Sequence, residues 1–389
     1  MMTSRGYTFL LLLIALAVFT QPPQLKAQIP LNPDNTVRLI GDIRTGYIGF
    51  VGEQRNGERL SRHELRNRTR IGFEVTVSRN VLFNVRYAGR VSTYDFHFHP
   101  GVHTSAPGNN GLLLGEGAFD QFYASVQLNE WLSARAGRFQ TSFTLDGNIK
   151  NSILRQDSPN TDISWTDGLH FKARATPSIT ADLVLQSHIS NPTTNVFRKP
   201  LDIPSSDVPI TLFLNLKKDI GQGVLNSFAF NITYSPDALI TNLDGQRAGY
   251  VAASIKPQLR HVFSSGRKLL LGTELAYSFS RPQRNVFGFT ENMAGRAGGF
   301  GFQSALTLMD AFKGQHIGIM ATMIGPSLLT SSAFWNNLLL FEMRHSVKLS
   351  RKLSSDLRLR YRADLETLNP ELDNRRWQLY PFARVTYKF

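Results

Sequence analysis

The stretch LRNRTRIGFEVTV, residues 65–77, alternates between polar and largely apolar positions. Its odd positions, from Leu65 to Val77, are mostly apolar, and its even positions carry three arginines and Glu74. A β-strand sends alternate side chains to opposite faces of a sheet. The stretch therefore predicts a strand with one apolar face and one basic face, and the question is how often the pattern recurs along the chain.

Comparable segments of about 9 to 15 residues recur along the chain, a length suited to tilted strands that cross a bilayer. We expect an all-β, transmembrane antiparallel β-barrel of about 16 strands, within a range of about 14 to 18. The even number places both chain ends on one side. The predicted strands begin at or near Val37, Leu65, Val81, Phe122, Leu132, Trp165, Ile179, Val208, Phe228, Gly249, Leu269, Phe300, Ile317, Trp335, Leu353 and Trp377.

Short and long connections alternate between these segments, as expected for a barrel with short periplasmic turns and long extracellular loops. The short ones lie at residues 78–80, 129–131, 176–178 and 350–352, with slightly longer ones near 218–222, 261–267 and 312–315. The long segments are rich in Gly, Pro and Asn. They cover residues 51–63, 99–116, 140–164, 191–207, 235–246 and 281–299, with shorter ones at 326–334 and 367–375.

Residues 1–27 have the pattern of a secretory signal peptide: Arg5 precedes an apolar run from Phe9 to Phe19, and a polar stretch ends at Ala27. We expect residues 28–389 to form a single transmembrane β-barrel domain. No stretch after residue 27 approaches 18 uninterrupted apolar residues, which a membrane-spanning helix would need. The mature chain is therefore predicted to be a barrel or, as an alternative, a soluble β-sandwich or β-helix.

The composition contains no cysteine, which excludes disulfides, thiolate metal sites and cysteine nucleophiles. The formal charge is +14, and removal of Arg5 and Lys26 with residues 1–27 leaves +12. An excess of this size indicates an anionic partner such as nucleic acid, anionic lipid or an anionic solute. Export disfavours nucleic acid, so we expect small anionic solutes and membrane lipid as partners.

The polar parity of the predicted strands faces the lumen if the apolar parity faces lipid, and its charges are mostly basic. Because the last strand pairs with the first in a closed barrel, these residues would form one basic wall that attracts anions. The alternative is that these charges form networks inside the lumen, Arg358 with Asp356 or Arg70 with Glu74, that stiffen the wall. The wall comprises Arg38, Arg44, Arg66, Arg68, Arg70, Arg86, Arg90, Arg135, Lys172, Arg174, Arg344, Lys348, Arg358, Arg360, Arg362 and Arg384.

Four tryptophans, Trp131, Trp165, Trp335 and Trp377, fall at predicted strand ends or turns. An amphipathic ring is stable at headgroup depth, so we expect these residues to mark the two membrane interfaces. Tryptophans in the core of a soluble protein are the alternative.

The last segment, WQLYPFARVTYKF (residues 377–389), alternates aromatic and polar residues and ends on Phe389. With Tyr387, it resembles the insertion signal of bacterial outer-membrane barrels, which implies an outer-membrane location and contact with the barrel-assembly machinery. The segment from Gly117 to Thr144, which contains QFYASVQLNEWLSARAGRFQTSF, resembles the strand, turn and strand of the phosphate-selective porin O/P family. That resemblance implies a channel without a cofactor, and the likeness to sixteen-stranded porins suggests a homotrimer.

In porins of this size the third surface loop commonly folds into the pore, so the resemblance makes residues 140–164 the candidate constriction loop. Its candidate residues are Asp146, Lys150, Arg155, Asp157 and Asp162, which could face one another across a narrowing. An ordinary solvent-exposed loop is the alternative.

Several other functions stay open. Asp95, His97 and His99 share one parity, an arrangement that a metal site would need, but the pattern favours a polar face at the edge of a loop. We find no catalytic constellation and expect a protein that is not an enzyme. The apolar segment from Ile317 to Ile324 fits a path for hydrophobic substrates. A closed barrel that acts in adhesion or secretion also fits. We predict a water-filled, anion-preferring porin.

Overall fold

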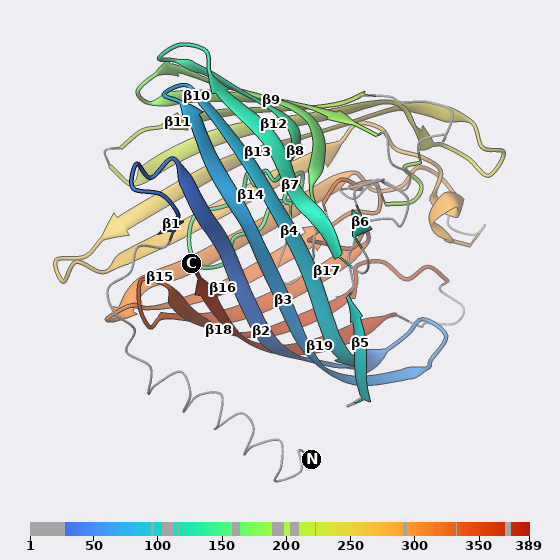
Figure 1. The fold of residues 1–389 in the computed structure, drawn as a ribbon. Helices are drawn as coiled ribbons and strands as arrows, with labels where there is room; N and C mark the ends of the chain where they lie inside the picture. Colours follow the sequence, from blue (N-terminus) through green and yellow to red (C-terminus); the bar gives the residue numbers. More distant parts are fainter. Residues whose placement is uncertain are drawn as a thin grey trace, which may run out of the picture.

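Sixteen antiparallel strands close into a single barrel in the computed structural model (Figure 1). The structure describes residues 28–94, 97–102, 113–114, 117–157, 164–188, 198–202, 210–221, 223–290, 294–331, 333–369 and 375–389. The predicted fold class and strand number are confirmed. Residues 1–27, the predicted signal peptide, lie outside the described residues.

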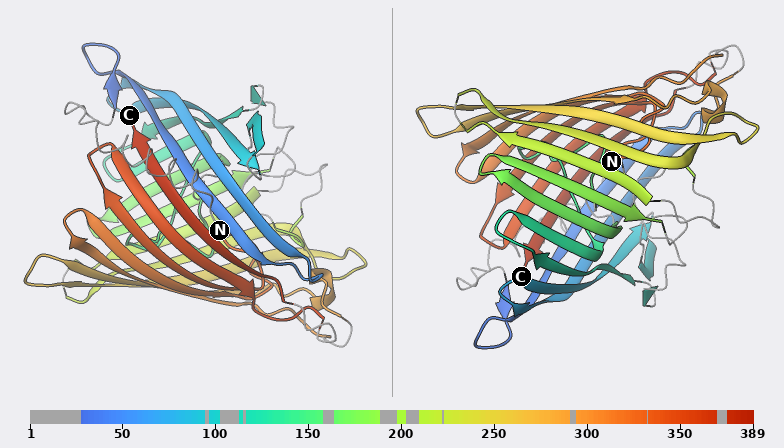
Figure 2. Two further views of the ribbon diagram at one scale, coloured as in Figure 1. Left: turned by 90° about the horizontal axis from the view of Figure 1, so that it is seen from below. Right: turned by 90° about the horizontal axis from the view of Figure 1, so that it is seen from above.

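Each barrel strand pairs with its neighbours along the chain, and the slanted strands are visible from both sides in Figure 2. The barrel strands are β2 (Val37–Glu53), β3 (Arg59–Ser78), β4 (Val81–Tyr94), β7 (Gly117–Gln127), β8 (Leu132–Phe139), β9 (Thr166–Thr176), β10 (Ile179–Ser187), β11 (Ile210–Asp219), β12 (Leu225–Ile240), β13 (Arg247–Val262), β14 (Lys268–Ser278), β15 (Phe300–Phe312), β16 (Gln315–Ile324), β17 (Leu338–Lys348), β18 (Leu353–Asp364) and β19 (Trp377–Lys388). Short additions are β1 (Ile29–Pro30), β5 (His97–Val102), β6 (Leu113–Leu114) and the 3₁₀ turn η1 (Arg284–Phe287).

Pairing between β19 and β2 closes the sheet. The seam runs from the Trp377–Glu53 pair to the Lys388–Asp42 pair. Beyond it, the Gly41 N–H donates to the Phe389 carbonyl at 2.9 Å and the Phe389 N–H donates to the Gly41 carbonyl at 3.1 Å. The start of β2 and the end of β19 therefore lie at the same end of the barrel, as the even strand number predicts.

We call this end the turn end, because short turns such as residues 79–80 and 177–178 lie there, and we call the opposite end the loop end. Two predicted long loops at the loop end are wrong. Strands β2 and β3 stay paired as far as Glu53 and Arg59, which leaves residues 54–58, and β12 and β13 leave residues 241–246. Polar residues extend the strands here because each paired neighbour supplies backbone hydrogen bonds.

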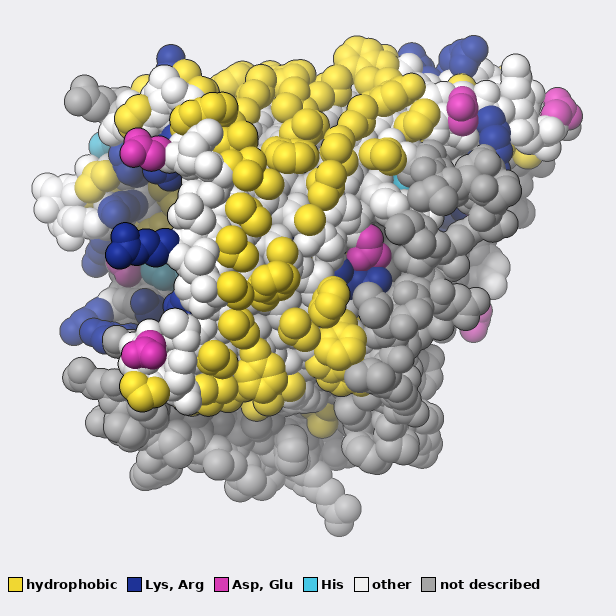
Figure 3. Space-filling view, turned by 45° about the horizontal axis from the view of Figure 1, so that its top comes forward, with side chains coloured by type: hydrophobic (Ala, Val, Ile, Leu, Met, Phe, Trp, Pro, Cys, Tyr) yellow, Lys and Arg dark blue, Asp and Glu magenta, His cyan; other side chains and the backbone are white. Residues whose placement is uncertain are grey.

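The barrel wall has an apolar outer face and a polar inner face, as the alternation predicts. Phe73, Phe341 and Leu357 point outward and are about half exposed, whereas Arg68 and Arg358 point inward and are buried. Apolar side chains cover the outer wall in Figure 3, and lysines and arginines lie toward the two ends of the barrel. Among the described residues, no helix is long and apolar enough to cross a membrane.

The seam makes a stability prediction at Gly41. A Cβ there would lie 2.6 Å from the Phe389 ring and would also meet the Arg70 carbonyl. Gly41→Val should therefore destabilise the folded barrel by about 1–3 kcal/mol, the usual cost of overpacking. The measurement is urea unfolding in detergent, read from the fast-migrating folded band on gels.

Gly298→Ala is the control for this variant, because a Cβ at Gly298 meets its nearest atoms at 3.6 Å. Equal unfolding midpoints for Gly41→Val and the wild-type protein would contradict the close packing at the seam.

Candidate functional site: the barrel interior

Residues 140–157 leave the wall after β8 and lie inside the barrel against strands from β13 to β17. The Asp146 N–H donates to the Gln258 side chain at 2.5 Å, and the Asn148 side-chain amide donates to the carbonyls of His316 and Arg344, each at 3.1 Å. Gly147 adopts φ +118°, and a Cβ there would lie 2.6 Å from the Thr307 hydroxyl. The segment therefore crosses the interior in contact with the wall. We call residues 140–157 the inner loop.

A buried ion pair in the wall anchors the inner loop. Lys256 on β13 and Glu274 on β14 are both buried, with Nζ and Oε1 3.2 Å apart. The Lys256 ammonium donates to the Phe143 carbonyl at 2.5 Å and to the Ser152 hydroxyl at 2.8 Å. The Glu274 carboxylate accepts the Ile153 N–H at 2.8 Å. Each buried charge thus finds part of its compensation in the inner loop.

Apolar side chains complete this contact. Leu145, Ile149 and Ile153 of the inner loop are buried in one cluster with Met320 and Ile324 of β16. This contact explains why both parities of β16 are apolar: one parity faces outward, and the other packs beneath the inner loop. The apolar segment from Ile317 to Ile324, which suggested a path for hydrophobic substrates, therefore forms part of the surface on which the inner loop packs.

Two of the predicted constriction residues are buried instead in the stem of the inner loop. Arg155 donates to the hydroxyls of Thr141, at 2.9 Å, and of Thr166, and Asp157 accepts the Thr141 N–H at 2.5 Å. Burial raises the pKa of Asp157 and lowers the pKa of Arg155. The prediction that these two border an opening is wrong, because their hydrogen bonds hold the stem together.

The other predicted constriction residues have different surroundings. Lys150 is exposed and lies within electrostatic reach of Lys388 at the end of β19. Asp146 borders an interior cavity of about 560 Å³ together with Lys172, Arg174 and other residues of β9 to β13. Asp162 lies outside the described residues.

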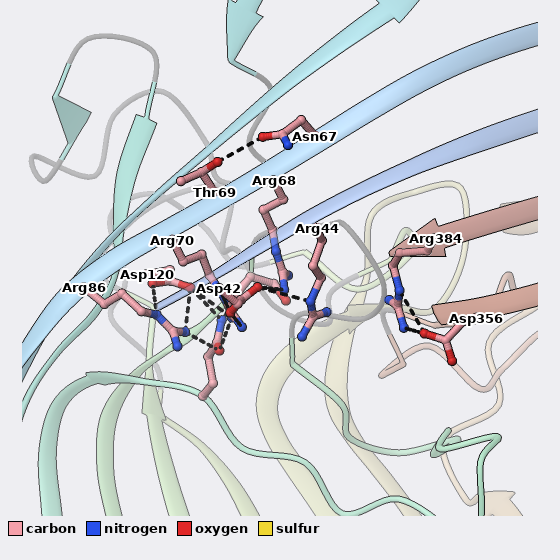
Figure 4. Close-up of polar contacts among 12 residues, drawn as sticks. Asp42, Arg44, Asn67, Arg68, Thr69, Arg70, Arg86, Asp120, Asp356 and Arg384 are labelled. Carbon is pink, nitrogen blue, oxygen red and sulfur yellow. Dashed lines mark hydrogen bonds and ion pairs between the residues drawn. The ribbon is translucent and has the colours of Figure 1, made fainter. Parts of the chain in front are cut away.

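One cluster of the basic wall surrounds Asp42 on β2 (Figure 4). Its carboxylate lies 3.2 Å from Arg44 Nε, 3.3 Å from an Arg68 terminal nitrogen and 2.6 Å from Arg70 Nε. Arg70 also reaches Asp120 on β7 at 3.5 Å, and Asp120 accepts hydrogen bonds from Arg86. The four guanidinium groups share two carboxylates, so this cluster carries a net charge of +2.

A second cluster surrounds Glu342 on β17, on the other side of the seam. The carboxylate pairs with Arg344 at 2.6 Å, Arg358 at 3.4 Å and also Arg360, so three guanidinium groups share one carboxylate and the net charge is again +2. The Arg358 guanidinium also lies 4.5 Å from the centre of the Phe382 ring. An aromatic face stabilises a cation without cancelling its charge.

The remaining predicted wall residues also lie on the inward parity of their strands. Arg38 pairs with Glu74 at 3.0 Å, Arg66 with Glu64 at 2.7 Å and Arg384 with Asp356. Arg135 lies over Tyr123, and Arg362 lies over Trp335 and Tyr380. The others on this parity are Arg90, Lys172, Arg174 and Lys348. The wall therefore contains the internal ion pairs that the alternative expects. In both large clusters, however, arginines outnumber carboxylates.

Two of the four tryptophans do not face lipid. Trp165 is fully buried, with its indole N–H donating to Asp167 at 3.2 Å and the Arg138 guanidinium 4.1 Å from its ring. Trp335 lies under Arg376 at 3.8 Å and Arg362 at 5.0 Å, toward the interior. The interface prediction is wrong for these two, because guanidinium groups of arginines inside the barrel lie over their rings. Trp131 and Trp377 stay predicted interface residues.

Sequence reasoning missed the anchor, Lys256 and Glu274, and the shared carboxylate of Asp120. Each lies on the inward parity of its strand, a signal that was available, although no pattern shows which strand lies opposite the inner loop. No group of metal-binding side chains occurs in the described part of the chain. Asp95 lies outside it, and the side chains of His97 and His99 are not described.

Comparisons with known proteins bear on the fold alone. No family model matches the chain, and no curated protein matches its sequence. Among solved structures it is similar to the high-pH structure of Pseudomonas putida OprB, with TM-score 0.62 and 11% identity over 92% of this chain and 95% of that chain. An anion-selective porin from Comamonas acidovorans matches with TM-score 0.52 and 11% identity, over 91% and 99%. Salmonella typhi OmpF matches with TM-score 0.55 and 8% identity, over 92% and 100%. The chain therefore has the barrel fold of outer-membrane porins.

The buried anchor makes a prediction about the inner loop. Glu274→Gln leaves the Lys256 ammonium buried without its counter-charge, which should cost about 3–5 kcal/mol and detach the inner loop. Because the chain has no cysteine, Leu154→Cys reports on this directly: Leu154 is 1% exposed. A small charged thiol reagent should label this cysteine much faster in the Glu274→Gln background than in the wild-type background.

Glu58→Gln, a change in a loop-end turn, is the matched control and should leave the labelling rate unchanged. A rate that does not respond to Glu274→Gln would show that the ion pair does not hold the inner loop.

Proposed function

We propose that the protein is an outer-membrane porin, a water-filled channel that prefers small anionic solutes. The observation that carries the proposal is the charge inside the barrel: seven arginines in the two large clusters share three carboxylates. A water-filled passage beside such a wall concentrates anions and repels cations. We propose a channel rather than an enzyme.

The apolar outer face supports a membrane location, since hydrocarbon requires that every backbone group be paired inside the barrel. With residues 1–27 as the signal peptide, the turn end would face the periplasm and the loop end the exterior. Tyr387 and Phe389 at the end of the chain would form the signal that the barrel-assembly machinery recognises. The porin folds of the similar structures favour the same location.

The inner loop would set the narrowest part of the passage. Lys150 on the inner loop and Lys388 on the wall repel each other electrostatically, and both side chains are exposed. A solute that passes between them would meet positive charge from both sides. Asp146 would face the cavity that Lys172 and Arg174 also line. The part of the passage near the turn end would therefore carry both negative and positive charge.

The chemistry of the wall favours phosphate or carboxylate solutes. Arginine presents a planar fork of donors that matches two oxygens of either group. One of the similar structures is that of an anion-selective porin, which agrees with the proposal. Phosphate and carboxylate share the geometry that arginine recognises, so the proposal names the class of solute and not its identity.

The direct test is conductance of the purified, folded protein in a planar bilayer under a potassium chloride gradient. We expect single-channel steps and a reversal potential with the sign of the chloride equilibrium potential, which shows that chloride is more permeant than potassium. Folded protein that inserts without conducting would overturn the channel and leave the closed barrel of adhesion or secretion as the function. A reversal potential with the sign of the potassium equilibrium potential would support the channel and overturn its anion preference.

Charge removal at the narrowing should weaken the selectivity, and it leaves every arginine and carboxylate of the two clusters in the sequence. Lys150→Gln combined with Lys388→Gln should lower the permeability ratio of chloride to potassium roughly two-fold to five-fold, because a unit charge about 4 Å from an ion in water contributes about 1 kcal/mol. The reversal potential of the double variant gives this ratio.

Lys218→Gln is the control, because Lys218 is exposed on the outward parity of β11 and does not face the lumen. If the double variant and the control gave the same ratio as the wild-type protein, the narrowing would lie elsewhere.

A further inference from the structure

The interior cavity of about 560 Å³ lies between the inner loop and the turn-end halves of β9 to β13. Packed rings close its loop-end side. The fully buried ring of Phe213 lies 4.8 Å from the ring of Phe143, centre to centre, and the Arg155 guanidinium lies 5.4 Å from the Phe213 ring. Toward the turn end, Lys172 and Arg174 are exposed. The cavity is therefore a blind pocket that opens toward the turn end, and we call it the side pocket.

Strand pairing places three cations of the side pocket in one row across the wall. Thr180 of β10 pairs with Arg174 of β9 on one side and with Lys217 of β11 on the other. Ala229 of β12 pairs with Lys217 and with Lys256 of β13. Arg174, Lys217 and Lys256 therefore lie at the same level, and we call these three residues the basic row.

A buried carboxylate lies in the next row toward the loop end, about 7 Å deeper, because inward side chains alternate along a strand. This carboxylate is Asp182, which pairs in register with Lys172 and with Asn215. Its Oδ1 lies 2.9 Å from His170 Nε2, and its Oδ2 accepts a hydrogen bond from the Asn215 side-chain amide at 2.8 Å. The side pocket therefore has a basic mouth and a carboxylate at its floor.

The Asp182 carboxylate can accept a further donor. A carboxylate offers about four acceptor positions, and its hydrogen-bond contacts with the described residues, His170 and Asn215, use two of them. A buried carboxylate needs such compensation, because burial removes its contacts with water. The ammonium group of a solute supplies N–H donors together with a positive charge. It therefore matches what Asp182 can still accept.

The basic row can accept an anion in the same way. Arg174 is exposed, and a guanidinium presents a fork of donors that matches a carboxylate. Lys217 lies 2.9 Å from Asp219, and a partly exposed pair of this kind contributes little, so a solute carboxylate can replace Asp219. Ala229 also lines the cavity, and its small side chain leaves space between Lys217 and Lys256.

We propose that the side pocket binds a small dipolar solute such as an α-amino acid, with its ammonium group on Asp182 and its carboxylate on Arg174 and Lys217. A simple anion would be repelled by Asp182, and a simple cation would be repelled by the basic row. A solute that carries both charges meets an opposite charge at each level. This inference goes beyond the proposed function, because such a solute has no net charge for the basic wall to select. It requires a water-filled interior and does not require anion preference.

The first experiment is isothermal titration calorimetry of the folded full chain in a non-ionic detergent, with L-glutamine as the probe. We expect saturable binding of one molecule per chain. N-acetyl-L-glutamine lacks the ammonium group and L-glutamine α-amide lacks the carboxylate, so each should bind about ten-fold more weakly or less. The proposal is overturned if L-glutamine does not bind. It is also overturned if N-acetyl-L-glutamine binds as tightly, because the pocket would then be a simple anion site.

The second experiment removes the carboxylate at the floor. Asp182→Asn should weaken L-glutamine binding about ten-fold and should not weaken binding of N-acetyl-L-glutamine, a difference that general damage to the pocket would not produce. Asp244→Asn, the same change in an exposed loop-end turn, is the control and should leave both affinities unchanged. Equal L-glutamine affinities for Asp182→Asn and the wild-type protein would overturn the proposal.

A second variant covers the case in which Asp182→Asn gives no folded band on gels. Lys217→Gln changes a partly exposed residue of the basic row and should weaken L-glutamine binding more than binding of L-glutamine α-amide. Equal losses for the two probes would overturn the proposal. Conductance of the same preparations separates this claim from the proposed function. Binding without conductance overturns the channel alone, and conductance without binding overturns the side pocket alone.

Discussion

Backbone pairing between β19 and β2 is the constraint on which the rest of the structure depends. A membrane leaves no unpaired backbone group without a large cost, so the sheet has to close. Closure fixes which parity of each strand faces outward, and with it the separation of an apolar exterior from a basic interior. The same pairing brings β2–β4 next to β17–β19, so arginines from opposite ends of the sequence share one region of the wall.

Inside that wall, carboxylates hold the arginines in place and do not neutralise them. Asp42 and Glu342 each contact three guanidinium groups, and removing either carboxylate would leave like charges packed together. Aromatic faces such as that of Phe382 stabilise further cations without adding negative charge. The wall is thus rigid and still net positive. The inner loop adds a second rigid element, because Lys256 and Glu274 find part of their compensation in its backbone and in Ser152.

The strand pattern was predictable because alternation is a local property of the sequence and a barrel repeats it in every strand. Even so, residues 51–63 and 235–246 misled the prediction, since polar residues continue a strand wherever a neighbour supplies hydrogen bonds. The inward parity of Arg68 and Arg358 was readable, whereas their shared carboxylates depended on which strands lie side by side. The positions of Trp165 and Arg155 depended on their neighbours in space. The pairing of β8 with β9 brings Arg138 to Trp165, and the folding of the inner loop brings Thr141 to Arg155.

The central claim is that fixed positive charge in a water-filled interior selects the solute, and the salt dependence of the permeability ratio tests it most directly. The Debye length falls from about 10 Å at 0.1 M salt to about 3 Å at 1 M. The account predicts a chloride-to-potassium ratio well above one in dilute potassium chloride that declines toward one as the salt concentration rises. A ratio at or below one in dilute salt, or one that does not change with salt, would contradict selection by the charged wall.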